Sequence, residues 1–162
     1  MTDWSTASAK WGDILGANLD ELYREVILDH SQNPRRMGTL AVPTHTLGLH
    51  NPTCGDKIAV DLLVEDGRVV DYRFSGHGCS ISMASASMLG DAVVGKPVAK
   101  ATKVARGFVA FLTNPQSEET PPGDLEALGG VRKFPARVKC ATLAHNALME
   151  ALAARGVRAE PH

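Results

Sequence analysis

Two stretches of the chain alternate between apolar and polar residues, which predicts a pair of β-strands. Apolar side chains occupy every second position over residues 58–64, and the alternation returns over residues 70–74. A period of two is typical of half-buried strands. Asp66 and Gly67, between the two stretches, form a strong signal for a two-residue turn. The pattern therefore predicts an antiparallel hairpin.

Other stretches space their apolar residues by three and four positions, as amphipathic helices do. The first begins near Asn18, which can cap it, and stops at Pro34. Three more helices are predicted over residues 80–94, 97–112 and 135–154. The helices outnumber the strands, and the predicted hairpin lies between the first helix and the second.

The chain length favours a single domain. A chain of 162 residues can bury roughly 70% of its unfolded surface, so its core does not need a metal. We expect a flexible N-terminal arm over residues 1–17, one domain over residues 18–155 and a C-terminal tail over residues 156–162. Within the domain, residues 114–130 contain several prolines and only acidic charges, which predicts a surface excursion.

Composition and charge exclude some classes of partner. The net charge is −1 and no long run of Lys or Arg occurs, so nucleic acid is not expected as a partner. No stretch approaches the roughly 18 uninterrupted apolar residues of a membrane span, and none is expected. Residues 1–15 lack the apolar core of a secretory leader, and we expect a cytoplasmic protein.

The candidate chemistry lies in three cysteines, Cys54, Cys79 and Cys140. Three is an odd number, which fits disulfide pairing poorly. Cys54 precedes the outgoing strand of the hairpin and Cys79 follows the returning one, so both should lie at the same end of the sheet. Asp56 adds a carboxylate two residues after Cys54. The last predicted helix can bring Cys140 to this end, although a role as a small buried hydrophobic residue stays open.

Three thiolates and one carboxylate could complete a tetrahedral zinc site. Cys79 precedes a helix, whose positive end favours a thiolate. Arg137 and Lys139 stand just before Cys140 and could stabilise thiolates or a transferred sulfur. They could instead be ordinary solvent-exposed charges that keep the helix soluble. Asp56 could instead be a turn residue. We expect His30 to lie at the edge of the first helix and not to be a ligand. His45, His50, His77 and His145 have no partner at a ligand spacing, and we expect them to be structural or to face solvent.

Three motifs resemble one known family. They are Asn-Pro-Thr-Cys-Gly-Asp over residues 51–56, Gly-His-Gly-Cys-Ser-Ile-Ser over residues 76–82 and Arg-Val-Lys-Cys-Ala-Thr-Leu-Ala over residues 137–144. Together they resemble the IscU/NifU-like iron-sulfur cluster assembly proteins, and the resemblance covers roughly residues 19–152. Lys139 stands where IscU-type scaffolds have histidine, and residues 114–130 resemble the insertion of the SufU branch.

The resemblance implies an α+β fold with a small antiparallel β-sheet packed against helices. It also implies a zinc-dependent sulfurtransferase that accepts persulfide sulfur from a SufS-type cysteine desulfurase and works with downstream iron-sulfur assembly proteins. The implied metal ligands are Cys54, Asp56, Cys79 and Cys140, with Cys54 as the sulfur acceptor and Arg137 beside it. A scaffold that assembles a [2Fe-2S] cluster is the alternative, because the same donors suit iron and sulfide. Whether Cys54 or Cys140 accepts sulfur first stays open.

Overall fold

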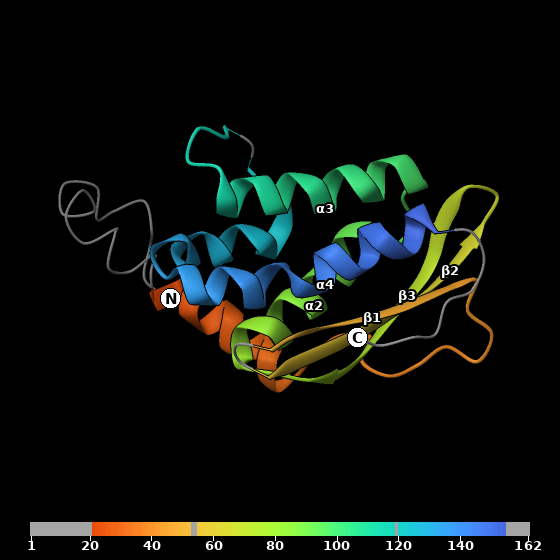
Figure 1. The fold of residues 1–162 in the computed structure, drawn as a ribbon, viewed down its shortest axis with the longest axis horizontal. Coiled ribbons are helices and arrows are strands. Elements are labelled where there is room, and N and C mark those ends of the chain that lie inside the picture. The colour runs from red at the N-terminus through yellow and green to blue at the C-terminus, as the bar shows by residue number, and fades with distance from the viewer. Residues whose placement is uncertain (1–20, 53–54, 119, 155–162) are drawn as a thin grey trace, which may run out of the picture.

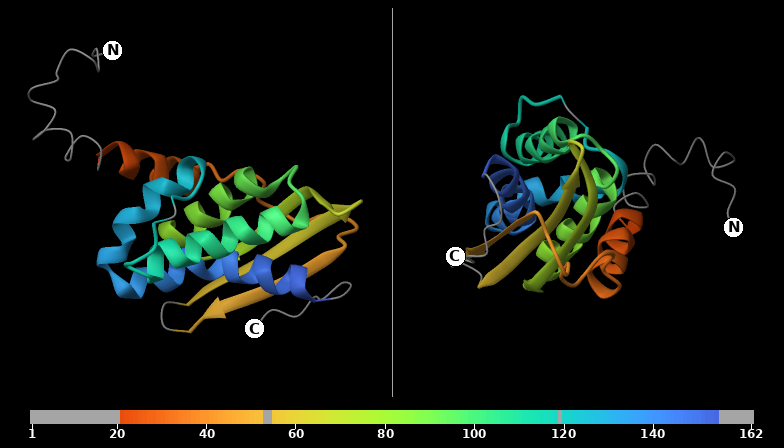
Figure 2. Two further views of the ribbon diagram at one scale, coloured as in Figure 1. Left: turned by 90° about the horizontal axis from the view of Figure 1, so that it is seen from above. Right: turned by 90° about the vertical axis from the view of Figure 1, so that its right-hand side faces the viewer.

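The protein folds as a three-stranded antiparallel sheet with helices layered on one of its faces (Figure 1). The structure is a computed structural model, and it describes residues 21–52, 55–118 and 120–154. Helices α2 and α4 lie between the sheet and helix α3, so the layers run sheet, helix pair and outer helix (Figures 1 and 2). This architecture confirms the expected α+β class with a small antiparallel sheet.

The predicted hairpin is present and longer than its alternating core. Strand β2 spans Asp56–Glu65 and pairs with β3, Arg68–His77, from Glu65 opposite Arg68 to Lys57 opposite His77. Asp66 and Gly67 both have positive φ angles, 53° and 76°. Such a turn matches the right-handed twist of the flanking strands. The hairpin therefore returns the chain to the end of the sheet from which β2 started.

A third strand was not predicted from the sequence. Strand β1, His45–Asn51, pairs with β2 from His45 opposite Leu62 to Asn51 opposite Asp56. Its apolar pattern is short, because only Leu47 and Leu49 supply large apolar side chains and Gly48 stands between them. Pairing with β2 stabilises this strand through backbone hydrogen bonds, which the weak apolar pattern does not predict.

Helices α2, α3 and α4 form close to their predicted bounds. Helix α2 spans Ser80–Val93, α3 spans Val98–Thr113 and α4 spans Pro135–Ala153. Proline lies just before α3 and at the first position of α4, where the missing backbone N–H donor costs nothing. In the described part of the chain, no helix is both long enough and apolar enough to cross a membrane.

The core has two parts that meet at the α2–α4 pair. The larger lies between the sheet and these helices and includes the fully buried side chains of Val60, Phe74 and Leu89. The smaller lies on the other side of α2 and includes Phe108 and Leu128. Burial of apolar side chains on this scale supports the expectation that the fold does not depend on a metal for its core.

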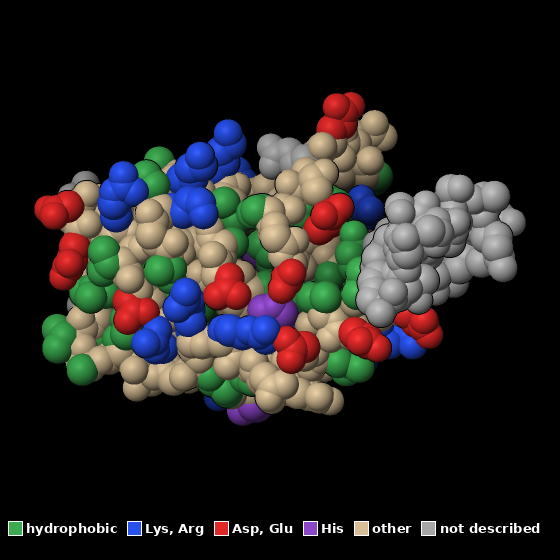
Figure 3. Space-filling view, turned by 180° about the vertical axis from the view of Figure 1, so that it is seen from behind, with side chains coloured by type: hydrophobic (Ala, Val, Ile, Leu, Met, Phe, Trp, Pro, Cys, Tyr) green, Lys and Arg blue, Asp and Glu red, His purple; other side chains and the backbone are tan. Residues whose placement is uncertain are grey.

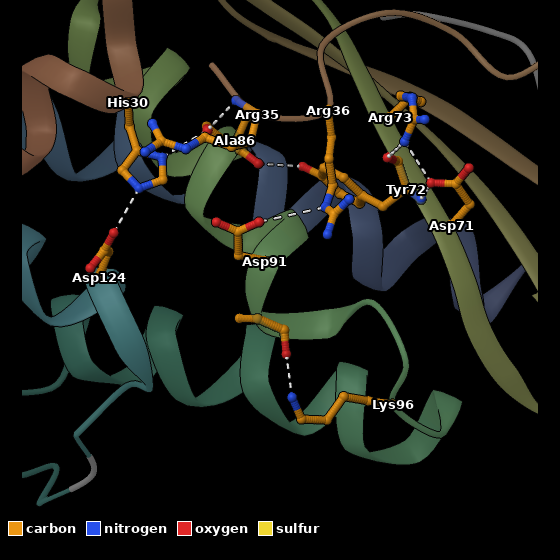
Figure 4. A network of polar contacts seen from close by, with 12 residues as sticks. His30, Arg35, Arg36, Asp71, Tyr72, Arg73, Ala86, Asp91, Lys96 and Asp124 are labelled. Atoms are coloured by element: carbon orange, nitrogen blue, oxygen red, sulfur yellow. Dashed lines mark hydrogen bonds and ion pairs between the residues drawn. The ribbon is translucent and has the colours of Figure 1, made fainter. Parts of the chain in front are cut away.

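Residues 21–32 form a helix, consistent with the first predicted helix, whose expected cap at Asn18 lies outside the described residues. His30 near its end is 1% exposed. Its Nδ1 lies 2.7 Å from Ser87 Oγ on α2, and its Nε2 lies 2.8 Å from an Asp124 carboxylate oxygen (Figure 4). His30 is therefore a buried structural residue that connects three segments, not a residue at the helix edge.

The predicted surface excursion is only partly correct. Residues Gly123–Lys133 form a 3₁₀ helix, η1, and its Leu125 and Leu128 are fully buried against α2, α3 and α4. Prolines before η1 suggested a loop, but the apolar residues within it supply part of the smaller core. The expected domain boundaries at residues 1–17 and 156–162 fall outside the described residues and stay predictions.

Charged side chains of both signs are interspersed on the face opposite to that of Figure 1 (Figure 3). Arg36 and Asp91 form one ion pair, with 3.6 Å between Arg36 Nε and Asp91 Oδ1 (Figure 4). The mixed pattern agrees with the net charge of −1.

Candidate metal centre

Asp56 and Cys79 lie close together because the start of β2 and the end of β3 are paired in the hairpin. Asp56 begins β2, and β3 ends at His77, opposite Lys57. The backbone N–H of Cys79 donates to Asp56 Oδ1 at 3.0 Å, and Cys79 Sγ lies 3.7 Å from Oδ2. Asp56 is only 2% exposed. A buried carboxylate is costly unless its oxygens are bonded, and these contacts reduce that cost.

Cys140 reaches the same place through the packing of α4 on α2. Ser82 Oγ on α2 lies 3.2 Å from the backbone oxygen of Cys140, and Ser85 donates to the next carbonyl, that of Ala141, at 2.6 Å. Two hydroxyls one helical turn apart thus fix the register of the two helices. As a result, ligand atoms of Asp56, Cys79 and Cys140 all lie within 4.8 Å of one another.

This donor set fits a zinc ion. Zinc binds thiolates at about 2.3 Å and carboxylate oxygens at about 2.1 Å, so two tetrahedral ligands should stand about 3.6 Å apart. The distance of 3.7 Å between Cys79 Sγ and Asp56 Oδ2 meets this requirement. Two thiols and a carboxylate leave one position for a further ligand. Cys54, predicted to take it, lies outside the described residues, and its position next to Cys79 stays a prediction.

Arg137 lies at the entrance of this site. It is exposed, in the first turn of α4, three residues before Cys140. Hydrogen bonding to Cys140 is the largest cause that raises the pKa of Arg137, and the negative charges of Cys79 and Cys140 add to it. The guanidinium is therefore placed to balance negative charge at the two sulfurs. Lys139, the other predicted cation, is also exposed.

Gly78 provides the room in which Asp56 approaches Cys79. A Cβ atom at Gly78 would lie 2.9 Å from Asp56 Cγ and 3.1 Å from Ser82 Cβ. Real side chains do not tolerate the first of these distances, so any larger residue would displace the carboxylate. The glycine just before Cys79 is thus a requirement of the site and not only of the turn.

An open groove of about 660 Å³ adjoins the metal site. It runs between the helix of residues 21–32, η1 and the first turn of α4, and both Ser80 and Arg137 line it. Phe134, on the same lining, is 60% exposed. Leu28 on the same lining is 41% exposed, so the groove exposes two large apolar side chains, and apolar patches are typical of surfaces that contact another molecule.

The family model described as the NifU-like N-terminal domain matches residues 22–158. The chain belongs to this family. It is 46% identical over 138 residues to the zinc-dependent sulfurtransferase SufU of Bacillus subtilis strain 168, covering 85% of this chain and 93% of the relative. It is 42% identical over 140 residues to the iron-sulfur cluster assembly scaffold protein IscU of Streptococcus pyogenes serotype M1, covering 84% and 86%.

The fold of this NifU-like domain also has solved counterparts. The crystal structure of FiSufU, a SUF-system protein of Fervidobacterium islandicum AW-1, superposes with a TM-score of 0.75 at 28% identity, covering 79% of this chain and 94% of that one. Together with the sequence relatives, this likeness confirms the family that the three motifs indicated.

Sequence reasoning missed part of this NifU-like site. Ser82 and Ser85 were not among the predicted site residues, yet their hydroxyls lie against the carbonyls of Cys140 and Ala141. His145 was expected to be structural or exposed, and it is fully buried with Nε2 at 2.9 Å from Ser85 Oγ. Small polar residues three positions apart on a buried helix face were the available signal. Of the other histidines, His45 is half-buried, and His50 and His77 are exposed.

Proposed function

We propose that the protein is a zinc-dependent sulfur acceptor of iron-sulfur cluster assembly, which takes persulfide sulfur from a SufS-type cysteine desulfurase in the cytoplasm. The observation that carries this proposal is the group of buried Asp56, half-buried Cys79 and buried Cys140, whose ligand atoms lie within 4.8 Å of one another. The 46% identity to a protein named zinc-dependent sulfurtransferase supports it.

In this proposal Cys54, Asp56, Cys79 and Cys140 hold the zinc. Bound zinc keeps its cysteine ligands deprotonated at neutral pH. The surroundings of the site support such ligands: Cys79 is the N-cap residue of α2, at the positive end of the helix dipole. Arg137 supplies the compensating positive charge at the entrance. Carboxylate ligands are less common in closed structural sites, which fits a site that exchanges one ligand.

The group transfer needs one nucleophile and one leaving thiolate. The Cys54 thiolate attacks the outer sulfur of the desulfurase persulfide, and a new sulfur–sulfur bond forms on Cys54. The sulfur–sulfur bond of the donor breaks, and the electron pair leaves with the donor cysteine as a thiolate. No net oxidation occurs, because one persulfide replaces another. Arg137 is the residue placed to balance the added negative charge at the site.

The groove beside the site provides a docking surface for the desulfurase. It ends at Ser80 and Arg137, next to the two described cysteines, and it exposes Phe134. A partner segment that occupied this groove would bring its reactive cysteine to the entrance rather than to the opposite side of the sheet.

The deciding experiment measures alanine and sulfide production by a cognate SufS-type desulfurase after addition of zinc-loaded, zinc-free or iron-reconstituted protein. We expect stimulation only by the zinc-loaded form. Cys54→Ala should abolish persulfide acceptance, and Arg137→Ala should reduce it several-fold. Arg106→Ala, an exposed arginine on α3, is the matched control and should behave like the wild type. Full transfer by Cys54→Ala would move the acceptor role to Cys140.

A second function, assembly of a [2Fe-2S] cluster, has its own support. The chain is 42% identical to a protein named as an IscU scaffold, and thiolate ligands also suit iron-sulfur clusters. The same experiment separates the two functions. If zinc-loaded protein fails to stimulate the desulfurase while the iron-reconstituted form transfers an intact cluster, the protein is a scaffold.

A further inference from the structure

One hydroxyl connects all three described donor residues of the metal site. Ser82 Oγ donates to Asp56 Oδ2 in a short hydrogen bond, lies 3.2 Å from the backbone oxygen of Cys140, and lies 3.9 Å from Cys79 Sγ. Ser82 is 1% exposed. Water therefore has little access to replace this hydroxyl, and its loss would be felt directly by its acceptors.

The hydroxyl has one proton and two oxygen acceptors. The contact with Asp56 is the shorter, and a carboxylate is a stronger acceptor than a neutral carbonyl, so the proton lies toward Asp56. The carbonyl of Cys140 belongs to α4, whose own backbone bonds also use such oxygens. The main effect of the Ser82 hydroxyl is therefore on the orientation of the carboxylate.

The two carboxylate oxygens of Asp56 are held by different residues beside the sulfurs. The Cys79 N–H holds Oδ1 at 3.0 Å, and Ser82 holds Oδ2, the oxygen that lies 3.7 Å from Cys79 Sγ. Without Ser82, Oδ2 would lose its short hydrogen bond, and the orientation of the carboxylate would be less firmly fixed. Oδ2 would then leave the position that a tetrahedral zinc ion requires.

We propose that Ser82 is a positioning residue of the metal site, whose hydroxyl holds Asp56 Oδ2 toward Cys79 and Cys140 and thereby sets how firmly the carboxylate binds the metal. The inference rests on the proposed metal site but not on sulfur transfer. Hydrogen bonds to ligating carboxylates commonly change metal affinity by 10- to 100-fold, and an effect of this size is expected here.

Ser85 provides a matched control within the same helix. It lies one turn further along α2, is fully buried, and has the same kind of double contact, with the Ala141 carbonyl and with His145. No described contact joins its hydroxyl to Asp56. Each of Ser82→Ala and Ser85→Ala therefore removes one buried hydroxyl between α2 and α4, while only Ser82→Ala should disturb the carboxylate.

The test measures zinc affinity by competition with a chromophoric chelator for wild type, Ser82→Ala, Ser85→Ala and Asp56→Ala. We expect a 10- to 100-fold loss for Ser82→Ala and less than a three-fold change for Ser85→Ala. In the Asp56→Ala background, Ser82→Ala should cause no further loss, because its effect passes through the carboxylate. Equal losses for the two serine variants, or full additivity with Asp56→Ala, would overturn the proposal.

Cobalt substitution gives a readout that helix packing alone does not alter. Absorption in the ligand-field region reports the geometry around Co²⁺, and sulfur-to-cobalt charge transfer reports the thiolates. Ser82→Ala should change the ligand-field absorption and retain the sulfur-to-cobalt charge transfer. Ser85→Ala should change neither. An unchanged ligand-field spectrum in Ser82→Ala would also refute the inference. Failure of the wild type to bind zinc at all would instead refute the proposed function.

Discussion

His145 should make the stability of this protein depend on pH. The imidazole is fully buried on α4, stacks on Phe108 with ring centroids 4.0 Å apart, and has Ser85 Oγ at 2.9 Å from Nε2. Its Nδ1 has no hydrogen-bond partner among the described residues. Burial lowers the pKa of His145 to about 3. The folded protein therefore keeps this side chain neutral over most of the acidic range.

The sign of the effect follows from the two protonation states. In the unfolded chain the pKa of a histidine is about 6.5. Below that pH the unfolded state binds a proton that folded His145 does not, so acid favours unfolding. The free energy of unfolding should fall by about 1.4 kcal/mol per pH unit as pH decreases from about 6.5 toward 3. At pH 5 the loss is about 2 kcal/mol, and near pH 3 it approaches about 5 kcal/mol.

This loss is large compared with the roughly 5–15 kcal/mol that stabilises a typical domain. The assay is urea unfolding of the zinc-free protein at several pH values between 7.5 and 4.5, which avoids protons released by metal binding. His145→Gln supplies the comparison, because glutamine does not titrate and can still bond Ser85. The variant starts less stable, but the gap between it and wild type should close as pH falls. Parallel curves for the two proteins would refute the reasoning.

Three other predictions concern the sheet and the docking groove. Gly76→Ala should lower the free energy of unfolding by about 3 kcal/mol or more, because the new Cβ atom would lie 1.9 Å from the Lys57 carbonyl oxygen. Gly67→Ala is the control: Gly67 has a φ of 76° and open space around it, so this variant should cost about 1 kcal/mol. Tyr72→Phe removes a buried hydroxyl that donates to the α2 backbone at 2.7 Å (Figure 4) and should cost about 1 kcal/mol in urea unfolding; no change would contradict that role. Phe134→Asp should raise the protein concentration that half-maximally stimulates the desulfurase while zinc content stays constant, and unaltered stimulation would place docking elsewhere.

The parts of the fold that could be predicted are those in which a single periodic pattern extends over many residues. The hairpin alternates on both sides of Asp66-Gly67, apart from a register shift between Leu63 and Val64. Helix α3 repeats its apolar residues over Val98–Thr113. Strand β1 escaped prediction because its stability comes from pairing with β2 and not from its own pattern. Helix η1 was not predicted because the prolines before it are a stronger local signal than its apolar residues Leu125 and Leu128.

The site divides in a similar way. Cys79, Cys140 and Asp56 could be proposed because thiols and carboxylates are chemically distinctive, and the hairpin explained why two of them meet. Serine is not distinctive, and Ser82 was not among the predicted site residues. Its role depends on a contact with Asp56 across 26 sequence positions, which no local pattern in the chain reveals. Long-range polar contacts of this kind are visible only once the fold is known.

Metal binding and helix packing share residues in this structure. At the α2–α4 contact the hydroxyls of Ser82 and Ser85 lie against consecutive carbonyls of α4, and the first of these carbonyls belongs to the donor Cys140. Asp56 and Cys79 instead depend on the closing of the hairpin. A metal ion bound by both the helix pair and the hairpin must stabilise their contact, because it binds only when the two are together. The two apolar core clusters include none of these three donor residues. This arrangement permits a metal site that exchanges a ligand while the fold around it persists.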